Sequence, residues 1–162
     1  MNKLFVVFLA ICFLLPAGAN AAECTYSSTR AFTEIMDDAN VQYQYGGLDE
    51  DKDEMVSVVY SGNSMQSIPT VWYFNETSVS VRVWNIISYN EEEFEDVAAV
   101  CNALNGSFRF VRFYANTSDN TVIAAYDMPV NENTAGKTYA EMLINIVKIV
   151  DEGYSVLSDY SK

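Results

Sequence analysis

The side chains that most often carry chemistry in proteins are scarce in this chain. It contains no histidine among its 162 residues, which removes the Ser-His-Asp and Cys-His arrangements of nucleophilic catalysis and every histidine metal site. The three cysteines do not form a zinc ligand set. The glycine pair at residues 46–47 is typical of a turn and not of a phosphate-binding loop. We therefore expect a protein that is not an enzyme and has no cofactor or metal site.

Cys24 and Cys101 are a candidate disulfide, because Cys12 lies in an N-terminal segment that we expect to be removed. In an oxidising compartment such a bridge would close a long loop. By the loop-entropy description, this closure would stabilise the folded state by up to about 4 kcal/mol. The alternative is that Cys101 is a small buried apolar residue and Cys24 lies unpaired near the terminus. The sequence leaves both open, since it does not give the distance between the two residues.

One acidic segment has part of the spacing of a calcium-binding loop. Asp49, Asp51 and Asp53 occupy its first three ligand positions. Glu54, however, stands where that loop needs a glycine, and Tyr60 stands where it needs a bidentate acid. We predict a solvated turn. Cation binding is retained only within the alternative function given below.

Four side chains are candidates for binding a protein partner. They are Arg82, Trp84, Arg109 and Arg112. Arginine and tryptophan are frequent anchors of protein interfaces. The competing explanation is that Trp84 packs beneath a helix and that the arginines pair with nearby acids.

The first residues have the pattern of a secretory signal peptide. Lys3 gives a positive start, residues 4–15 are an apolar run, and Ala19-Asn20-Ala21 is a small-residue cleavage site. An uncleaved anchor is the alternative, but the run is short for the roughly 20 residues of a spanning helix. We predict a signal peptide over residues 1–21, cleaved after Ala21, and a secreted or periplasmic single domain over residues 22–162 without stable membrane insertion.

The charge of the mature chain excludes two classes of partner. Cleavage removes Lys3 and no acid, so 8 basic side chains face 22 acidic ones, a formal charge of −14. Such a chain repels the phosphates of nucleic acids and anionic membrane surfaces. We expect no nucleic-acid partner. The acidity is typical of a soluble exported protein.

The apolar spacing predicts helices gathered against an antiparallel sheet. Ser27 or Ser28 is expected to cap the first helix, and Asn90 with Glu93 forms a capping box for the second. Loops between the strands are short, which requires antiparallel neighbours. The result is an α+β two-layer sandwich with the order α-β-β-β-α-β-β-α, or with a fourth early strand. Helices are expected over residues 27–40, 91–104 and 139–157, and strands over residues 41–45, 55–61, 68–75, 79–88, 107–115 and 121–128.

Several of these segments together resemble the YbjN family, which groups bacterial sensory-transduction regulators. The likeness rests on Cys-Asn-Ala-Leu-Asn at residues 101–105, Phe-Arg-Phe-Val-Arg-Phe-Tyr at 108–114, Tyr-Asp-Met-Pro-Val at 126–130 and the long terminal helix. It covers about residues 27–158. The resemblance implies a fold like that of type III secretion chaperones, small acidic proteins that hold partner chains, often as dimers. It supplies no active site.

The leading hypothesis is therefore an exported, non-enzymatic protein-interaction or chaperone-like module, with a regulatory role implied by the resemblance. We expect a protein partner of unknown identity, and a homodimer fits the resemblance. The alternative is an exported domain that binds a small molecule or a cation between its sheet and a helix.

Overall fold

The computed structural model describes residues 24–130 and 135–162. The predicted signal peptide lies outside these ranges. Helices cover α1 (Ser27–Asp38), α2 (Phe94–Ser107) and α3 (Ala135–Leu157), and strands cover β1 (Gln44–Leu48), β2 (Glu54–Tyr60), β3 (Ile68–Phe74), β4 (Ser78–Val83), β5 (Arg112–Asn116) and β6 (Thr121–Pro129). Short 3-10 turns lie at Glu91–Glu93 and Ser158–Tyr160. The predicted α+β class is confirmed, and the fourth early strand that the prediction left open is present before α2.

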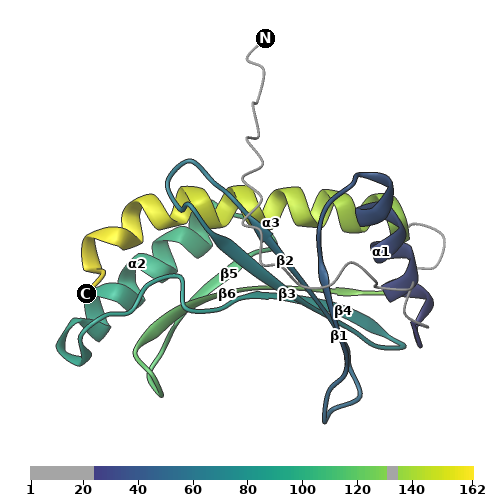
Figure 1. Ribbon diagram of the computed structural model, residues 1–162. Helices are drawn as coiled ribbons and strands as arrows, with labels where there is room; N and C mark the ends of the chain where they lie inside the picture. Colours follow the sequence, from purple (N-terminus) through teal and green to yellow (C-terminus); the bar gives the residue numbers. More distant parts are fainter. Residues whose placement is uncertain (1–23, 131–134) are drawn as a thin grey trace.

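The six strands form one antiparallel sheet in the order β1-β2-β3-β4-β6-β5. The first four strands are antiparallel neighbours in chain order, as the short loops between them predict. β6 then pairs with β4, and β5 lies at the edge. All three helices cover one face of the sheet (Figure 1), with α3 along its length and α1 and α2 towards opposite ends. None of the helices in the described ranges is long and apolar enough to cross a membrane.

The core lies between the sheet and the helices. Alternate residues of the strands point into it, among them Trp72, Phe74 and Val81, all fully buried. Phe32 of α1 packs 4.4 Å from the ring of Trp72, and Tyr139 of α3 meets Phe74 edge-on at 6.0 Å. Such aromatic pairs each add about 0.5–1.5 kcal/mol beyond the burial of their area. The inward-facing apolar residues of β3 and β4 are all fully buried: Ile68, Trp72, Phe74, Val79, Val81 and Val83.

The start of α1 differs from the prediction. Neither Ser27 nor Ser28 caps it, and Tyr26 at the N-cap position makes no side-chain cap bond. Glu54 of β2 instead binds the segment that leads into the helix, with its carboxylate accepting bonds from the amides of Thr25 (2.6 Å) and Tyr26 (3.0 Å). Glu54 is fully buried, so its assignment to a solvated turn was wrong. The exposed part of that turn is closed by Asp49, which accepts bonds from the amides of residues 51 and 53.

A second buried carboxylate ties α3 to the opposite end of the β2–β3 hairpin. Asp151 accepts bonds from the amides of Asn63 (2.9 Å), Ser64 (2.8 Å) and Met65 (2.8 Å). A Cβ atom at Gly62 would overlap the Asp151 carboxylate, so this position requires glycine. Together with Glu54, Asp151 connects the helical layer to the sheet by charge-assisted hydrogen bonds, which are stronger than neutral ones.

The two ends of α2 gave one confirmed prediction and one wrong one. Asn90 and Glu93 form the predicted capping box, and the Glu93 carboxylate accepts a bond from the Asn90 amide at 2.9 Å. The helix was expected to end at residue 104, before Asn105-Gly106, but it continues to Ser107. Asn105 instead reaches the edge strand β5. It accepts a bond from the Phe113 amide (2.7 Å) and donates one to the Phe113 carbonyl (2.8 Å).

Candidate functional site

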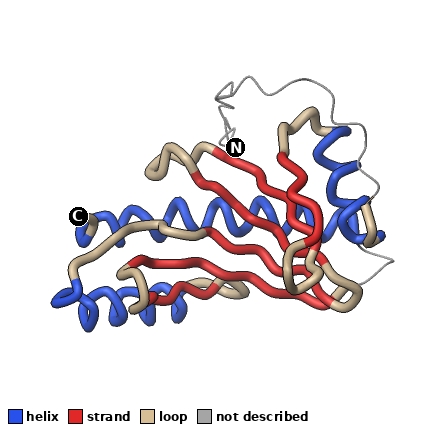
Figure 2. The backbone as a smooth tube through the Cα atoms, turned by 60° about the horizontal axis from the view of Figure 1, so that its bottom comes forward, coloured by secondary structure: helices blue, strands red, loops and turns tan. Residues whose placement is uncertain are grey.

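The sheet face opposite the helices, here called the open face, carries no helical layer within the described residues (Figure 2). Its side chains alternate along each strand with those of the core. The described strands contain two acidic and two basic residues. Glu54 faces the helices, whereas Asp127, Arg82 and Arg112 lie on the open face. The strands of this very acidic chain therefore present more positive than negative groups there.

Strand pairing brings two predicted residues into one line. Arg82 of β4 is paired with Ala125 of β6, and Ala125 is paired in turn with Arg112 of β5. Val71 of β3 continues the line on the other side of Arg82. We call Val71, Arg82, Ala125 and Arg112 the arginine row. Neighbouring strands lie about 4.8 Å apart, so the two arginine Cα atoms are separated by roughly 10 Å.

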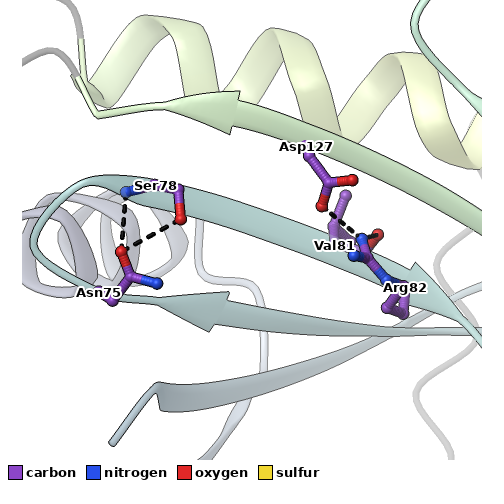
Figure 3. Close-up of polar contacts among 5 residues, drawn as sticks. All are labelled: Asn75, Ser78, Val81, Arg82 and Asp127. Carbon is purple, nitrogen blue, oxygen red and sulfur yellow. Dashed lines mark hydrogen bonds and ion pairs between the residues drawn. The ribbon is translucent and has the colours of Figure 1, made fainter. Parts of the chain in front are cut away.

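The two arginines of the row differ in their partners. Arg82 forms an ion pair with Asp127 at 2.7 Å and donates a second bond to the Val81 carbonyl at 3.0 Å (Figure 3). The predicted alternative of pairing with an acid is thus true of Arg82. Arg112 donates to the Val111 carbonyl at 3.2 Å, and no ion pair involves it within the described part of the chain.

Two buried apolar residues of β6 lie on the open face and not in the core. Ile123 and Ala125 are only 2% and 8% exposed, yet neither belongs to the core cluster between sheet and helices. Tyr114 is the direct cross-strand partner of Ile123 and is 40% exposed. Trp84 directly follows β4 and is 41% exposed. The idea that Trp84 packs beneath a helix was wrong, because Trp72 is the buried tryptophan.

Arg109 is not part of the row. It is exposed in the segment between α2 and β5 and takes no part in the strand register. Its neighbour Phe110 has a positive φ of 73° and stacks on Tyr126 at 5.8 Å. The structure thus groups Arg82 and Arg112 and leaves Arg109 aside. Tyr114 and Ala125 were missed, since the sequence shows apolar strands here without showing which strand each one joins.

The candidate disulfide is not formed. Cys24 and Cys101 are both free and buried. The Cys24 thiol lies 4.0 Å from the Thr33 hydroxyl at α1, whereas Cys101 belongs to α2, towards the other end of the sheet (Figure 1). Burial raises the pKa of both thiols, that of Cys101 to about 11. Both are therefore protonated at neutral pH and are weak nucleophiles.

The buried carboxylates are occupied by structural bonds. Glu54 accepts four of them, including one from the Tyr45 hydroxyl at 2.6 Å. Asp151 accepts three. Within the residues that the structure describes, no group of three or more candidate ligands could hold a metal ion. We assign these acids to the stability of the fold, and the open face is the candidate site.

Comparisons with known proteins point to one family. The model of the YbjN family, described as "Putative bacterial sensory transduction regulator", matches residues 30–158. Among solved structures, the chain is similar to the "Crystal structure of YbjN, a putative transcription regulator from E. coli", with 11% identity and a TM-score of 0.42. That match covers 76% of this chain and 88% of the other. A comparison with curated proteins gave no match.

Proposed function

The chain belongs to the YbjN family, and from this premise we propose that it is a non-enzymatic module that binds a protein partner outside the cytoplasm. A family of regulators of sensory transduction acts through partners, which supports a binding role. The chaperone-like character and the regulatory role belong to the same proposal. Export rests on the signal-peptide pattern of residues 1–21.

The open face is the observation that carries this proposal. It combines the partly exposed Tyr114 with Arg82 and Arg112 on neighbouring strands, and the partly exposed Trp84 directly follows β4. Aromatic residues and arginine are enriched in protein interfaces, whereas lysine and acids are depleted. Val59 on the same face is 60% exposed. An exposed face with aromatic and guanidinium groups suits a protein partner, because these groups are enriched in protein interfaces.

Site-specific photo-crosslinking in the organism of origin tests the proposal. A photoreactive amino acid is placed at Val59 on the open face, or at Ile144 on α3 as a control. Both are β-branched aliphatic residues with similar exposure, 60% and 62%. We expect a heterologous protein adduct of defined mass from Val59 and none from Ile144. Adducts only from Ile144, only between two copies of this chain, or from neither position would contradict the proposal.

The same preparation tests export. Amino-terminal sequencing of the protein recovered from outside the cytoplasm should begin at Ala22 if cleavage follows Ala21. A chain that starts at Met1 or remains in the cytoplasm would contradict export. It would not contradict the binding role.

A further inference from the structure

We propose that the arginine row recognises a carboxylate on an extended segment of the partner, and that apolar side chains of this segment pack on Trp84 and Tyr114. This inference rests on the proposed function of the open face in protein binding. It also specifies the chemistry of the partner: a segment in which acidic and apolar side chains alternate.

The charge distribution supports an acidic partner. The chain as a whole carries 22 acids against 9 bases, so an acidic protein is repelled from most of its surface. Both basic residues of the described strands lie on the open face, and the only acid beside them in those strands, Asp127, is already paired with Arg82. Complementary charge mainly determines where and how fast a partner docks. An acidic segment is therefore directed to this face.

The geometry of the row suits a single carboxylate. Arg82 and Arg112 are the cross-strand neighbours of Ala125 on its two sides, so both arginines lie in one line on the same face of the sheet. Arg82 uses its Nη1 group for both Asp127 and the Val81 carbonyl, so Asp127 competes with a bound carboxylate for this arginine. Arg112 retains donors that the described residues do not use, since it bonds only the Val111 carbonyl. A guanidinium group binds a carboxylate with two parallel bonds.

We place the extended segment across the open face and not along the edge of β5. Asn105 bonds both the amide and the carbonyl of Phe113, so the outward backbone groups of this edge-strand residue are already occupied. Nucleic acid is disfavoured by the overall negative charge.

Selection from a displayed library of random short peptides tests the inference on the mature protein. Peptides enriched on the wild type should carry Asp or Glu flanked by aromatic or aliphatic residues. Their affinity should fall about tenfold or more in Arg112→Glu, as expected for a lost charge pair. Lys137→Glu on α3 makes the same charge change far from the row and should retain more of the affinity. Circular dichroism checks that each variant is folded.

Asp127→Asn provides a gain-of-function test. It removes the carboxylate that competes for Arg82, so binding should become tighter, whereas Glu141→Gln on α3 changes the net charge equally and should have less effect. Enrichment of basic or neutral peptides, no enrichment, or equal affinity of Arg112→Glu and Lys137→Glu would overturn the inference. If Val59 still yields a partner adduct in that case, the open face binds protein by other chemistry and the proposed function stands.

Discussion

Glu54 shows how one buried side chain can join two layers of a fold. It belongs to β2 but binds the start of α1, through the amides of Thr25 and Tyr26 and the Thr29 hydroxyl at 2.6 Å. Burial alone would raise the pKa of this carboxyl. The hydrogen bonds, led by those from Thr29 and Tyr45, outweigh burial and hold the pKa below its usual value of 4.5. Glu54 is therefore ionised at neutral pH, where it also complements the positive end of the helix dipole.

Replacing Glu54 by glutamine should destabilise the protein. The amide group would place donor hydrogens against donors that now meet a carboxylate oxygen, at a cost of about 2 kcal/mol or more in the free energy of unfolding. Because the folded-state pKa is lowered, the contribution of Glu54 is complete above pH 4.5 and is lost as the pH falls through the folded-state value. Urea unfolding between neutral and acidic pH should show a weaker pH dependence in Glu54→Gln than in the wild type.

Glu50→Gln is the matched control, since Glu50 is exposed in the same hairpin. Exposed substitutions of this kind usually change stability by less than about 0.5 kcal/mol. Equal unfolding free energies and equal pH dependences for the two variants would show that the Glu54 bonds contribute nothing net.

At the scale of elements, the β5 edge of the sheet needs protection from pairing with the strands of other chains. β5 ends the strand order next to β6, and an edge strand exposes backbone groups that can pair with other chains. Asn105 of α2 satisfies both outward groups of Phe113 with one side-chain amide. The helix thus covers the edge by hydrogen bonding as well as by packing.

Asn105→Ala should expose this edge. The Phe113 amide and carbonyl would lose their partners, which should lower the free energy of unfolding by about 1–3 kcal/mol and increase self-association. Asn102→Ala, at an exposed position of the same helix, should do neither. Urea unfolding and light scattering at rising protein concentration measure the two effects. Similar behaviour of both alanine variants would contradict the role of Asn105.

Much of the element pattern could be predicted from local sequence, but not the partners of polar residues. The alternation of Val79, Val81 and Val83 fixes the inner face of β4, and Asn90 with Glu93 marks the start of α2. Nothing local separates Asn105, which reaches eight residues ahead to Phe113, from an ordinary helix stop. The predicted strand at residues 107–115 also begins only at Arg112, because the backbone has positive φ at Phe110.

In the candidate site, too, local sequence predicts the residue types but not their arrangement. Arg82, Trp84 and Arg112 could be selected by residue type alone. Their arrangement depends on the insertion of β6 between β4 and β5, which puts Ala125 between two arginines that are thirty positions apart in the chain. Strand order of this kind is set by long-range packing and not by periodicity. The same long-range order places α1 and α2 apart, which leaves Cys24 and Cys101 unbridged.

At the scale of the whole molecule, acidity is poorly balanced by ion pairs. The chain has a formal charge of −13 before any cleavage. The described residues contain three ion pairs, of which two are exposed contacts between Lys and Glu on α3. Exposed pairs contribute at most about 1 kcal/mol each. Repulsion among the remaining acids therefore dominates the electrostatics of the folded state.

Added salt should consequently stabilise this protein. Raising NaCl from about 0.01 M to about 0.15 M shortens the screening length from roughly 30 Å to roughly 8 Å. We expect the Tm to rise by roughly 2–4 °C, as for a gain of about 1 kcal/mol in a domain of this size. The gain should shrink near pH 5, where part of the carboxylates become protonated. The same salt increase should weaken binding of acidic peptides to the arginine row, so that stability and affinity change in opposite directions. A Tm that falls with salt at neutral pH would mean that attractive pairs outweigh the repulsion.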